Sequence, residues 1–140
     1  MDINAALRID MDVLEHAGRA DHIRSVAFRT GLYLAHKGKE PVGDCCVDFN
    51  YFLGQAFVSL LIVAQPFQKM GFGFALLEHV ERLLDGDLWT STNLTNGPMI
   101  SLLLGRGYRA CGQLDGLDDR DPELFFKKSK RGAKVNFQQV

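Results

Sequence analysis

Residues 63–84, VAQPFQKMGFGFALLEHVERLL, contain the change of hydrophobic period that decides the fold. Before this stretch the apolar residues alternate or run together as they do in strands, and within it they begin to recur at helical spacing. Gly71 and Gly73 stand at the junction. The stretch therefore predicts a strand that leads through a glycine turn directly into a helix, whose apolar face is formed by Leu76, Leu77, Val80, Leu83 and Leu84.

A glycine turn between a strand and a helix leaves backbone N–H groups unpaired at the positive end of the helix dipole. Such a turn suits a phosphate or pyrophosphate, and glycine permits its close approach. An equally open interpretation is that the glycines only make the turn and a tight contact between helix and sheet. Two known phosphate motifs fit badly. A P-loop needs a Lys and a hydroxyl after its glycines, but Lys69 precedes Gly71, and Leu76 stands where a dinucleotide fingerprint needs a small residue.

The segments that flank this stretch predict further strands and helices. Residues 32–64 form apolar runs that are broken at KGKEP and LGQ, which indicates three consecutive strands joined by tight turns. Downstream we expect a strand over residues 88–92, a helix over 96–107, and two final strands over 108–114 and 123–129.

The first thirty residues are interpreted as a strand, AALRID at 5–10, followed by a helix, ADHIRSVAFRTG at 20–31. The resulting fold class is α/β, with a mixed, mostly antiparallel central sheet and flanking helices. We expect a single domain over residues 1–128 and a loose, basic C-terminal tail over 129–140.

Composition limits the classes of function. The 140 residues are 46% hydrophobic and 24% charged, which is typical of one soluble domain. Sixteen Lys and Arg against 17 Asp and Glu provide no basic field, so neither a nucleic acid nor a membrane is expected as a partner, whereas a homodimer stays open. The N-terminus lacks the basic residues of a signal peptide, which favours a cytoplasmic location.

The cysteines and histidines predict neither disulfides nor a metal site. Cys45 and Cys46 are neighbours on a predicted strand and should point to opposite faces of the sheet. His36 and His79 show no ligand spacing with the cysteines, and Cys111 is interpreted as a buried strand residue.

Three separated segments resemble the GNAT superfamily of acetyl-CoA-dependent N-acetyltransferases. The family signature is Gln or Arg, two residues, Gly, one residue, then Gly or Ala, and Gln68, Gly71 and Gly73 are similar to it, with Val63 upstream. KGKEPVG resembles the family's turn into a Val-Gly strand start, and NGPMISLLLGRGY resembles its Asn, helix and Gly-aromatic segment. The resemblance covers residues 32–127 in order.

The resemblance implies acetyl-CoA as the cosubstrate and a set of residues that bind it. Backbone N–H groups of the glycine turn would hold the pyrophosphate, and the backbone of the preceding strand would pair with the pantetheine arm. Asn96 would lie beside that arm, or would only cap the helix that follows it. The residues implied are Ile62, Val63, Gln68, Lys69, Met70, Gly71, Phe72, Gly73, Phe74 and Asn96.

The resemblance further implies an acyltransferase in which an amine, on a small molecule or a protein, attacks the thioester directly. No catalytic residue is identified, because Gln55 and Ser59 occupy the strand that sometimes carries a catalytic Glu. Leu103 stands where the family commonly has a Tyr that protonates the sulfur, and we expect it to face the thioester.

The acid-rich loop at residues 113–123, QLDGLDDRDPE, has two interpretations: it attracts a cationic amine, or it is simply solvated. Its acids are Asp115, Asp118, Asp119, Asp121 and Glu123. The alternative function for the whole chain is a non-catalytic acyl-CoA-binding or sensing module with the same fold. A flavin or nicotinamide protein is a third alternative.

Overall fold

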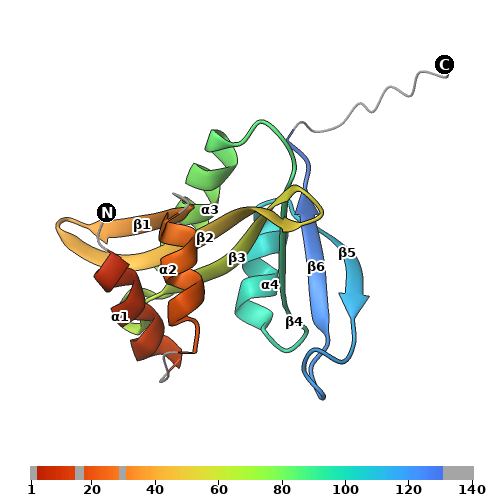
Figure 1. Cartoon of the computed structure of the whole chain (residues 1–140), viewed down its shortest axis with the longest axis horizontal. Coiled ribbons are helices and arrows are strands. Elements are labelled where there is room, and N and C mark those ends of the chain that lie inside the picture. The colour runs from red at the N-terminus through yellow and green to blue at the C-terminus, as the bar shows by residue number, and fades with distance from the viewer. Residues whose placement is uncertain (1–2, 15–17, 29–30, 131–140) are drawn as a thin grey trace.

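The computed structural model describes residues 3–14, 18–28 and 31–130, which form one mixed α/β unit (Figure 1). Its sheet has the strand order β1-β2-β3-β4-β6-β5, and every neighbouring pair is antiparallel except β3 and β4. The predicted fold class is confirmed. The strands are β1 Leu32–Lys37, β2 Glu40–Phe52, β3 Gln55–Val63, β4 Leu88–Asn93, β5 Arg109–Leu114 and β6 Glu123–Lys128. The helices are α1 Ile3–Leu14, α2 Ala20–Phe28, the short 3₁₀ turn η1 Gln65–Phe67, α3 Phe72–Leu83 and α4 Gly97–Gly105.

The first three strands form the predicted meander, and its second turn has an unusual residue at the tip. Leu53 and Gly54 join β2 to β3 with φ angles of 51° and 74°, the positive pair that a two-residue hairpin turn requires. Gly54 adopts this conformation at no steric cost, whereas Leu53 is strained there and is 89% exposed.

Helices cover both faces of the sheet (Figure 1). One face packs against α3 and α4 in a core that includes Cys45, Val58, Leu77, Leu103 and Phe126. The other face packs against α1 and α2 in a second cluster formed by Ala6, Ile23, Leu32, Cys46 and Leu60. The two adjacent cysteines thus lie on opposite faces, as predicted, whereas Cys111 is exposed on β5 and its predicted burial is wrong.

The prediction of a strand over residues 5–10 is wrong, because this segment lies within α1. Its buried residues Ala5, Ala6, Ile9 and Asp10 follow helical spacing, which a six-residue window does not separate from a short apolar run. The second predicted helix is confirmed as α2, although residues 29–30 lie outside the described residues. Residues 131–140 of the predicted tail also lie outside them.

Strands β3 and β4 separate soon after they meet, and this divergence positions the candidate site. Their parallel pairing consists of Ala56 with Leu88, Phe57 with Trp89, and Val58 with Thr90. Beyond Val58, β3 continues to Val63 without a described strand on that side. At the same place Ser59 is an extra residue in the pairing with β2, because Val58 is opposite Val47 and Leu60 is opposite Cys46.

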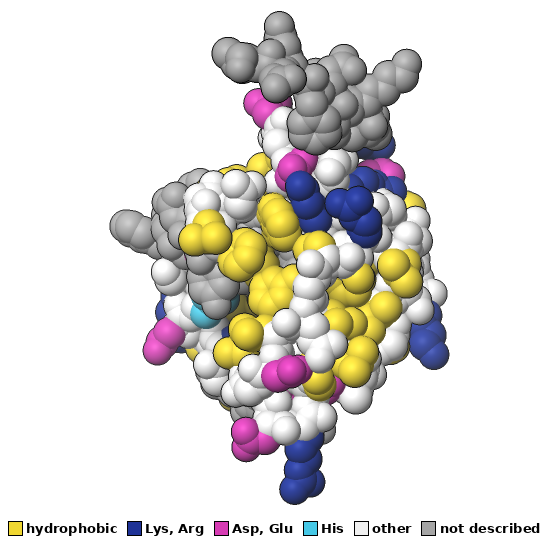
Figure 2. Space-filling view, turned by 90° about the vertical axis from the view of Figure 1, so that its right-hand side faces the viewer, with side chains coloured by type: hydrophobic (Ala, Val, Ile, Leu, Met, Phe, Trp, Pro, Cys, Tyr) yellow, Lys and Arg dark blue, Asp and Glu magenta, His cyan; other side chains and the backbone are white. Residues whose placement is uncertain are grey.

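The β4–β6 half of the sheet carries an aromatic cluster. Phe52, at the end of β2, lies 5.5 to 5.7 Å by ring centroid from three other aromatic rings, those of Phe57, Trp89 and Phe125. Figure 2, seen from the β5 side, shows hydrophobic side chains gathered in the middle of that face of the molecule. This half of the sheet therefore presents apolar surface beside the point where β3 and β4 diverge.

Candidate functional site

The glycine turn presents unpaired backbone N–H groups at the start of α3. Gly71 is the N-cap residue with φ 90°, and no side chain caps the helix. Ala75 donates to the Gly71 carbonyl at 3.0 Å, so the N–H groups of Phe72, Gly73 and Phe74 precede the first bond within the helix. Among the described residues they have no hydrogen-bond partner. The turn is therefore a cradle of N–H donors that suits an anion.

Positions 71 and 73 require glycine for different reasons. A Cβ at Gly71 would meet no atom within 4 Å, so glycine is required there by its positive φ. A Cβ at Gly73 would lie 3.2 Å from Cδ2 of Leu102 in α4. A close contact therefore explains Gly73, although its nearest neighbour is α4 and not the sheet as the alternative had it, and the conformation of the turn explains Gly71. Lys69, in the same loop, also has a positive φ, 62°.

The open side of β3 carries backbone groups that face away from β2. Ala64, the residue after β3, donates to the Val42 carbonyl at 2.8 Å, and the Ile62 carbonyl lies against Gly43, so the backbone groups of Ile62 and Ala64 face β2. Because backbone groups alternate along a strand, Leu61 and Val63 face the open side. The Val63 carbonyl accepts a hydrogen bond from Nε2 of Gln68 at 2.9 Å, which ties the glycine turn to β3.

Asn96 is the N-cap residue of α4. Its Oδ1 accepts from the Met99 N–H at 3.3 Å, and its Nδ2 donates to Oγ1 of Thr92 at 3.0 Å. The capping role that we left open is therefore present, and its placement beside a pantetheine arm remains a prediction.

Leu103 does not face the open side of β3, and that expectation is wrong. Its side chain is fully buried in the core below α4, together with Leu77 and Phe126. Tyr108 is buried in the same core, and its hydroxyl donates to Oε2 of Glu81 at 3.0 Å. Neither residue is available as a proton donor at the divergence of β3 and β4.

The acid-rich loop between β5 and β6 is partly structural. Asp121 accepts a hydrogen bond from the backbone N–H of Thr95 at 3.0 Å and another from the Thr95 hydroxyl. Its carbonyl accepts from Nδ2 of Asn93 at 3.1 Å. These bonds fasten the loop to the segment between β4 and α4, while Asp115, Asp118 and Asp119 are exposed.

A buried acidic pair lies between α1 and the sheet, and the sequence analysis did not identify it. Asp10 of α1 is bonded by Arg19, with distances of 3.1 Å from Nε and 2.7 Å from Nη2. Asp44 of β2 is fully buried, and neither of its carboxylate oxygens has a hydrogen-bond partner among the described residues. Burial, reinforced by the charge of Asp10 and opposed by Arg19, raises the pKa of Asp44 to about 7.

A second pair missed by the sequence analysis joins α2 to β3. Nε2 of His22 lies 2.7 Å from Oγ of Ser59, and both side chains are half-buried. Ser59 is the extra residue of β3, next to the last pairing with β4. No sequence pattern signals this contact, because 37 positions separate the two residues.

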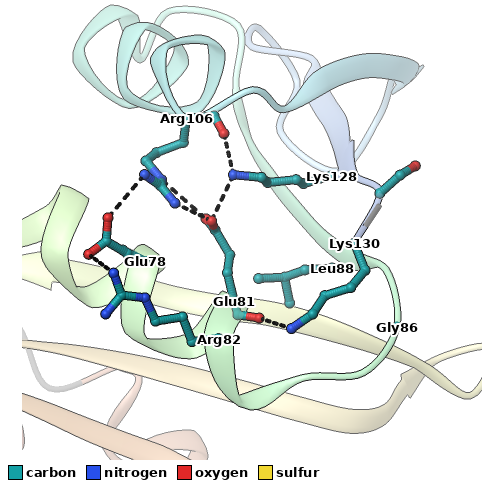
Figure 3. A pocket seen from close by; sticks show the side chains of 9 residues that line it. Glu78, Glu81, Arg82, Gly86, Leu88, Arg106, Lys128 and Lys130 are labelled. Carbon is teal, nitrogen blue, oxygen red and sulfur yellow. Dashed lines mark hydrogen bonds and ion pairs between the residues drawn. The ribbon is translucent and has the colours of Figure 1, made fainter. Parts of the chain in front are cut away.

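A cavity of about 330 Å³ lies at the opposite end of α3 from the glycine turn (Figure 3). Glu81, in the cavity wall, is nine residues beyond Phe72, about 14 Å along the helix. In the cavity wall the carboxylate of Glu81 accepts from Arg106 at 2.5 Å, Lys128 at 2.8 Å and Tyr108 at 3.0 Å. These hydrogen bonds lower the pKa of Glu81 against the opposing effect of burial. The cavity therefore belongs to an ion-pair network that joins α3, α4 and β6.

Glu81→Gln is expected to lower the free energy of unfolding by about 2 kcal/mol near neutral pH, because Arg106 and Lys128 lose their compensating charge. Since the folded state lowers the pKa of Glu81, this contribution is lost as the pH falls through the folded pKa, and the difference between variant and wild type should shrink in acid. Urea unfolding at several pH values measures it. Glu78→Gln is the control: Glu78 contacts Arg106 only at 3.4 Å, and its other partner, Arg82, is 75% exposed, so we expect less than about 1 kcal/mol. An equal effect of both variants would contradict this role.

The described residues contain no helix long and apolar enough to cross a membrane. They also contain no group of three or more His, Cys, Asp or Glu side chains that could hold a metal ion.

Comparisons with known proteins agree with this geometry. The model of the family described as "Acetyltransferase (GNAT) family" matches residues 6–108. A crystal structure of a GNAT-family acetyltransferase from Bacillus cereus ATCC 10987 is 25% identical, with a TM-score of 0.87 over 93% of this chain and 92% of that chain. No curated protein sequence matches the chain.

Two more distant structures share the fold. The ribosomal-protein-S18-alanine N-acetyltransferase of Escherichia coli is 18% identical, with a TM-score of 0.73 over 99% of this chain and 94% of that chain. An aminoglycoside 6'-N-acetyltransferase complexed with coenzyme A is 13% identical, with a TM-score of 0.77 over 94% of this chain and 92% of that chain.

Proposed function

Since the chain belongs to the GNAT acetyltransferase family, we propose that this acyltransferase moves an acetyl group from acetyl-CoA to an amine. One observation carries the proposal: the unpaired N–H groups at the start of α3 lie directly beyond the open side of β3. An anion-binding turn and an unpaired strand edge in this order match the two chemically different parts of acyl-CoA, a pyrophosphate and an amide-containing arm.

The pyrophosphate would be held by the turn over residues 68–74. The N–H groups of Phe72, Gly73 and Phe74 would donate to its oxygens at the positive end of α3, and the loop residues Gln68, Lys69, Met70 and Gly71 would complete the cradle. Gln68 would also keep the loop next to β3, because its side chain is bonded to the Val63 carbonyl.

The pantetheine arm would pair with the open side of β3 as an additional strand. The groups available for it are the backbone N–H and carbonyl of Leu61 and the N–H of Val63, because Ile62 faces β2. Asn96 would lie on the other side of the arm, at the start of α4. The N–H of Leu61 is proposed as the donor that stabilises the negative charge on the thioester oxygen.

The acceptor is proposed to be a primary amine on a small molecule or a protein. Two neighbours in fold, named for acetylating a ribosomal-protein alanine and an aminoglycoside, span both classes. The amine nitrogen would attack the acetyl carbon directly, and the thiol would leave. Because a thiol with a pKa near 8.5 leaves readily as thiolate, turnover should not need a tyrosine as proton donor.

Acetyl-CoA is expected to raise the melting temperature more than NAD or ATP at equal concentration, because only the acetyl-CoA arm can also pair with β3. At one hundred times the dissociation constant the stabilisation should be about 2.7 kcal/mol. A thermal shift assay with the three ligands measures this. Equal shifts from all three would contradict a site specific for the arm.

Release of free thiol from acetyl-CoA in the presence of primary amines tests the reaction itself. The panel should include a peptide with a free α-amino group, a lysine side chain in a blocked peptide, a polyamine and an aminoglycoside. Release that depends on one of these amines supports the proposal and identifies the acceptor class. Acetyl-CoA binding without thiol release on any amine would favour the non-catalytic acyl-CoA-binding module instead.

A further inference from the structure

We infer that His22 and Ser59 form the proton-accepting pair for the acceptor amine, an inference that rests on the proposed function. Ser59 is the extra residue of β3 and follows Val58, the last residue of β3 that pairs with β4. Its hydroxyl lies 2.7 Å from Nε2 of His22 in α2. The pair therefore lies at the apex, the point just beyond Val58 and Thr90 at which β3 and β4 diverge, on the face of the sheet covered by α1 and α2.

This face is the side from which an amine can approach. The opposite face is closed at the same level by the core under α3 and α4, in which Val58 is 2% exposed and Leu88 is 2% exposed. The N–H of Leu61, the proposed oxyanion donor, lies two residues beyond Ser59, about 7 Å along the strand. Ser59 and His22 are half-buried, so a ligand at the apex can reach them.

The other titratable groups around α2 are unsuited to the role. Asp10 is engaged by Arg19, and the carboxylates of Asp44 and Asp48 on β2 are at most 5% exposed. Burial raises the pKa of the Cys46 thiol to about 12. On α2 itself, Asp21 and Arg24 are exposed and form an ion pair at 3.5 Å. An ammonium group at the apex therefore meets the hydroxyl of Ser59 and the imidazole behind it.

Every proton of the step has an acceptor: His22 takes one and later releases it to water, and the thiolate takes the other. The ammonium group of the acceptor gives one proton to Ser59 Oγ as the serine proton passes to Nε2 of His22, which becomes an imidazolium. The free amine forms the C–N bond with the acetyl carbon, the C–S bond breaks, and the second nitrogen proton goes to the departing thiolate. Histidine suits this exchange because its pKa lies near neutral pH.

The test compares His22→Gln, Ser59→Ala and the double variant with wild type on two kinds of amine. The first is the primary amine from the panel that wild type acetylates best, which is an ammonium ion near neutral pH. The second is hydroxylamine, which is already uncharged there and needs no base. His79→Gln is the control, because His79 is exposed on α3, on the opposite face of the sheet.

With the ammonium substrate, kcat/KM should fall about 100-fold in each single variant and by little more in the double variant, because the two residues act as a unit. With hydroxylamine the loss should stay below about threefold, and the dissociation constant of acetyl-CoA should not change. Equal losses on both amines would overturn the inference, because a structural role would affect both. Wild type that binds acetyl-CoA but acetylates neither amine would overturn the proposed function, and this inference with it.

Discussion

Gly71→Val is expected to weaken acetyl-CoA binding by about 100-fold while the protein remains folded. At φ 90° a β-branched side chain is strongly disfavoured, so the turn must change its conformation and the N–H groups of Phe72 to Phe74 lose their common direction. Loss of two charge-assisted hydrogen bonds accounts for about 3 kcal/mol, which corresponds to this change in affinity. Isothermal titration calorimetry of acetyl-CoA measures it, with circular dichroism as the check of folding.

Two matched variants separate the turn conformation from other effects of adding a side chain. Gly71→Asn should retain most of the affinity, because Asn tolerates a positive φ and a Cβ at this position meets no atom within 4 Å. Gly86→Val also places a side chain in open space, outside the turn, and should bind as wild type does. Gly73 is a poorer test, because its Cβ would press on Leu102. Unchanged affinity in a folded Gly71→Val protein would refute the cradle.

Asp44→Asn is expected to raise the free energy of unfolding by up to about 4 kcal/mol at pH 8. In the folded protein, burial and the nearby charge of Asp10 raise the pKa of this carboxyl from 3.8 to about 7. A difference of about three pKa units corresponds to about 4 kcal/mol, since each unit is worth about 1.36 kcal/mol. Asparagine resembles the protonated acid and carries no charge into the interior. Urea unfolding of both proteins at pH 8 measures the difference.

The sign of this effect follows from the way in which the free energy of unfolding of the wild type depends on pH. A carboxyl whose pKa is raised by folding stabilises the protein fully below its unfolded value, near 3.8, and the contribution is lost as the pH rises to about 7. The free energy of unfolding of the variant should therefore stay constant over the pH range, about 4 to 7, in which wild type loses stability. Asp12→Asn, on an exposed position of α1, is the control and should follow wild type. If the free energy of unfolding of wild type and of Asp44→Asn depended on pH in the same way, ionisation of Asp44 would not destabilise the folded protein, and this prediction would be wrong.

Patterns that are local in the sequence predicted most of the fold. The meander follows from apolar runs separated by turn residues, and α3 follows from apolar residues at helical spacing after Gly71 and Gly73. The segment 5–10 was assigned wrongly because Ala5, Ala6 and Ile9 are compatible with a strand over so short a window. The same local signals placed the glycine turn at the start of a helix, which is why an anion site could be expected there before any contact was known.

The sequence by itself determined the order of the elements from β1 onward, the glycine turn and the family, because turn chemistry and hydrophobic period act between near neighbours. Only the tertiary structure decided that Leu103 lies in the core, that Gly73 is small because of Leu102, and that His22 meets Ser59. The buried Asp44 was equally hidden. Each of these depends on elements far apart in the chain that pack together, and burial or a contact across a sheet leaves no periodic signal in the residues that make it.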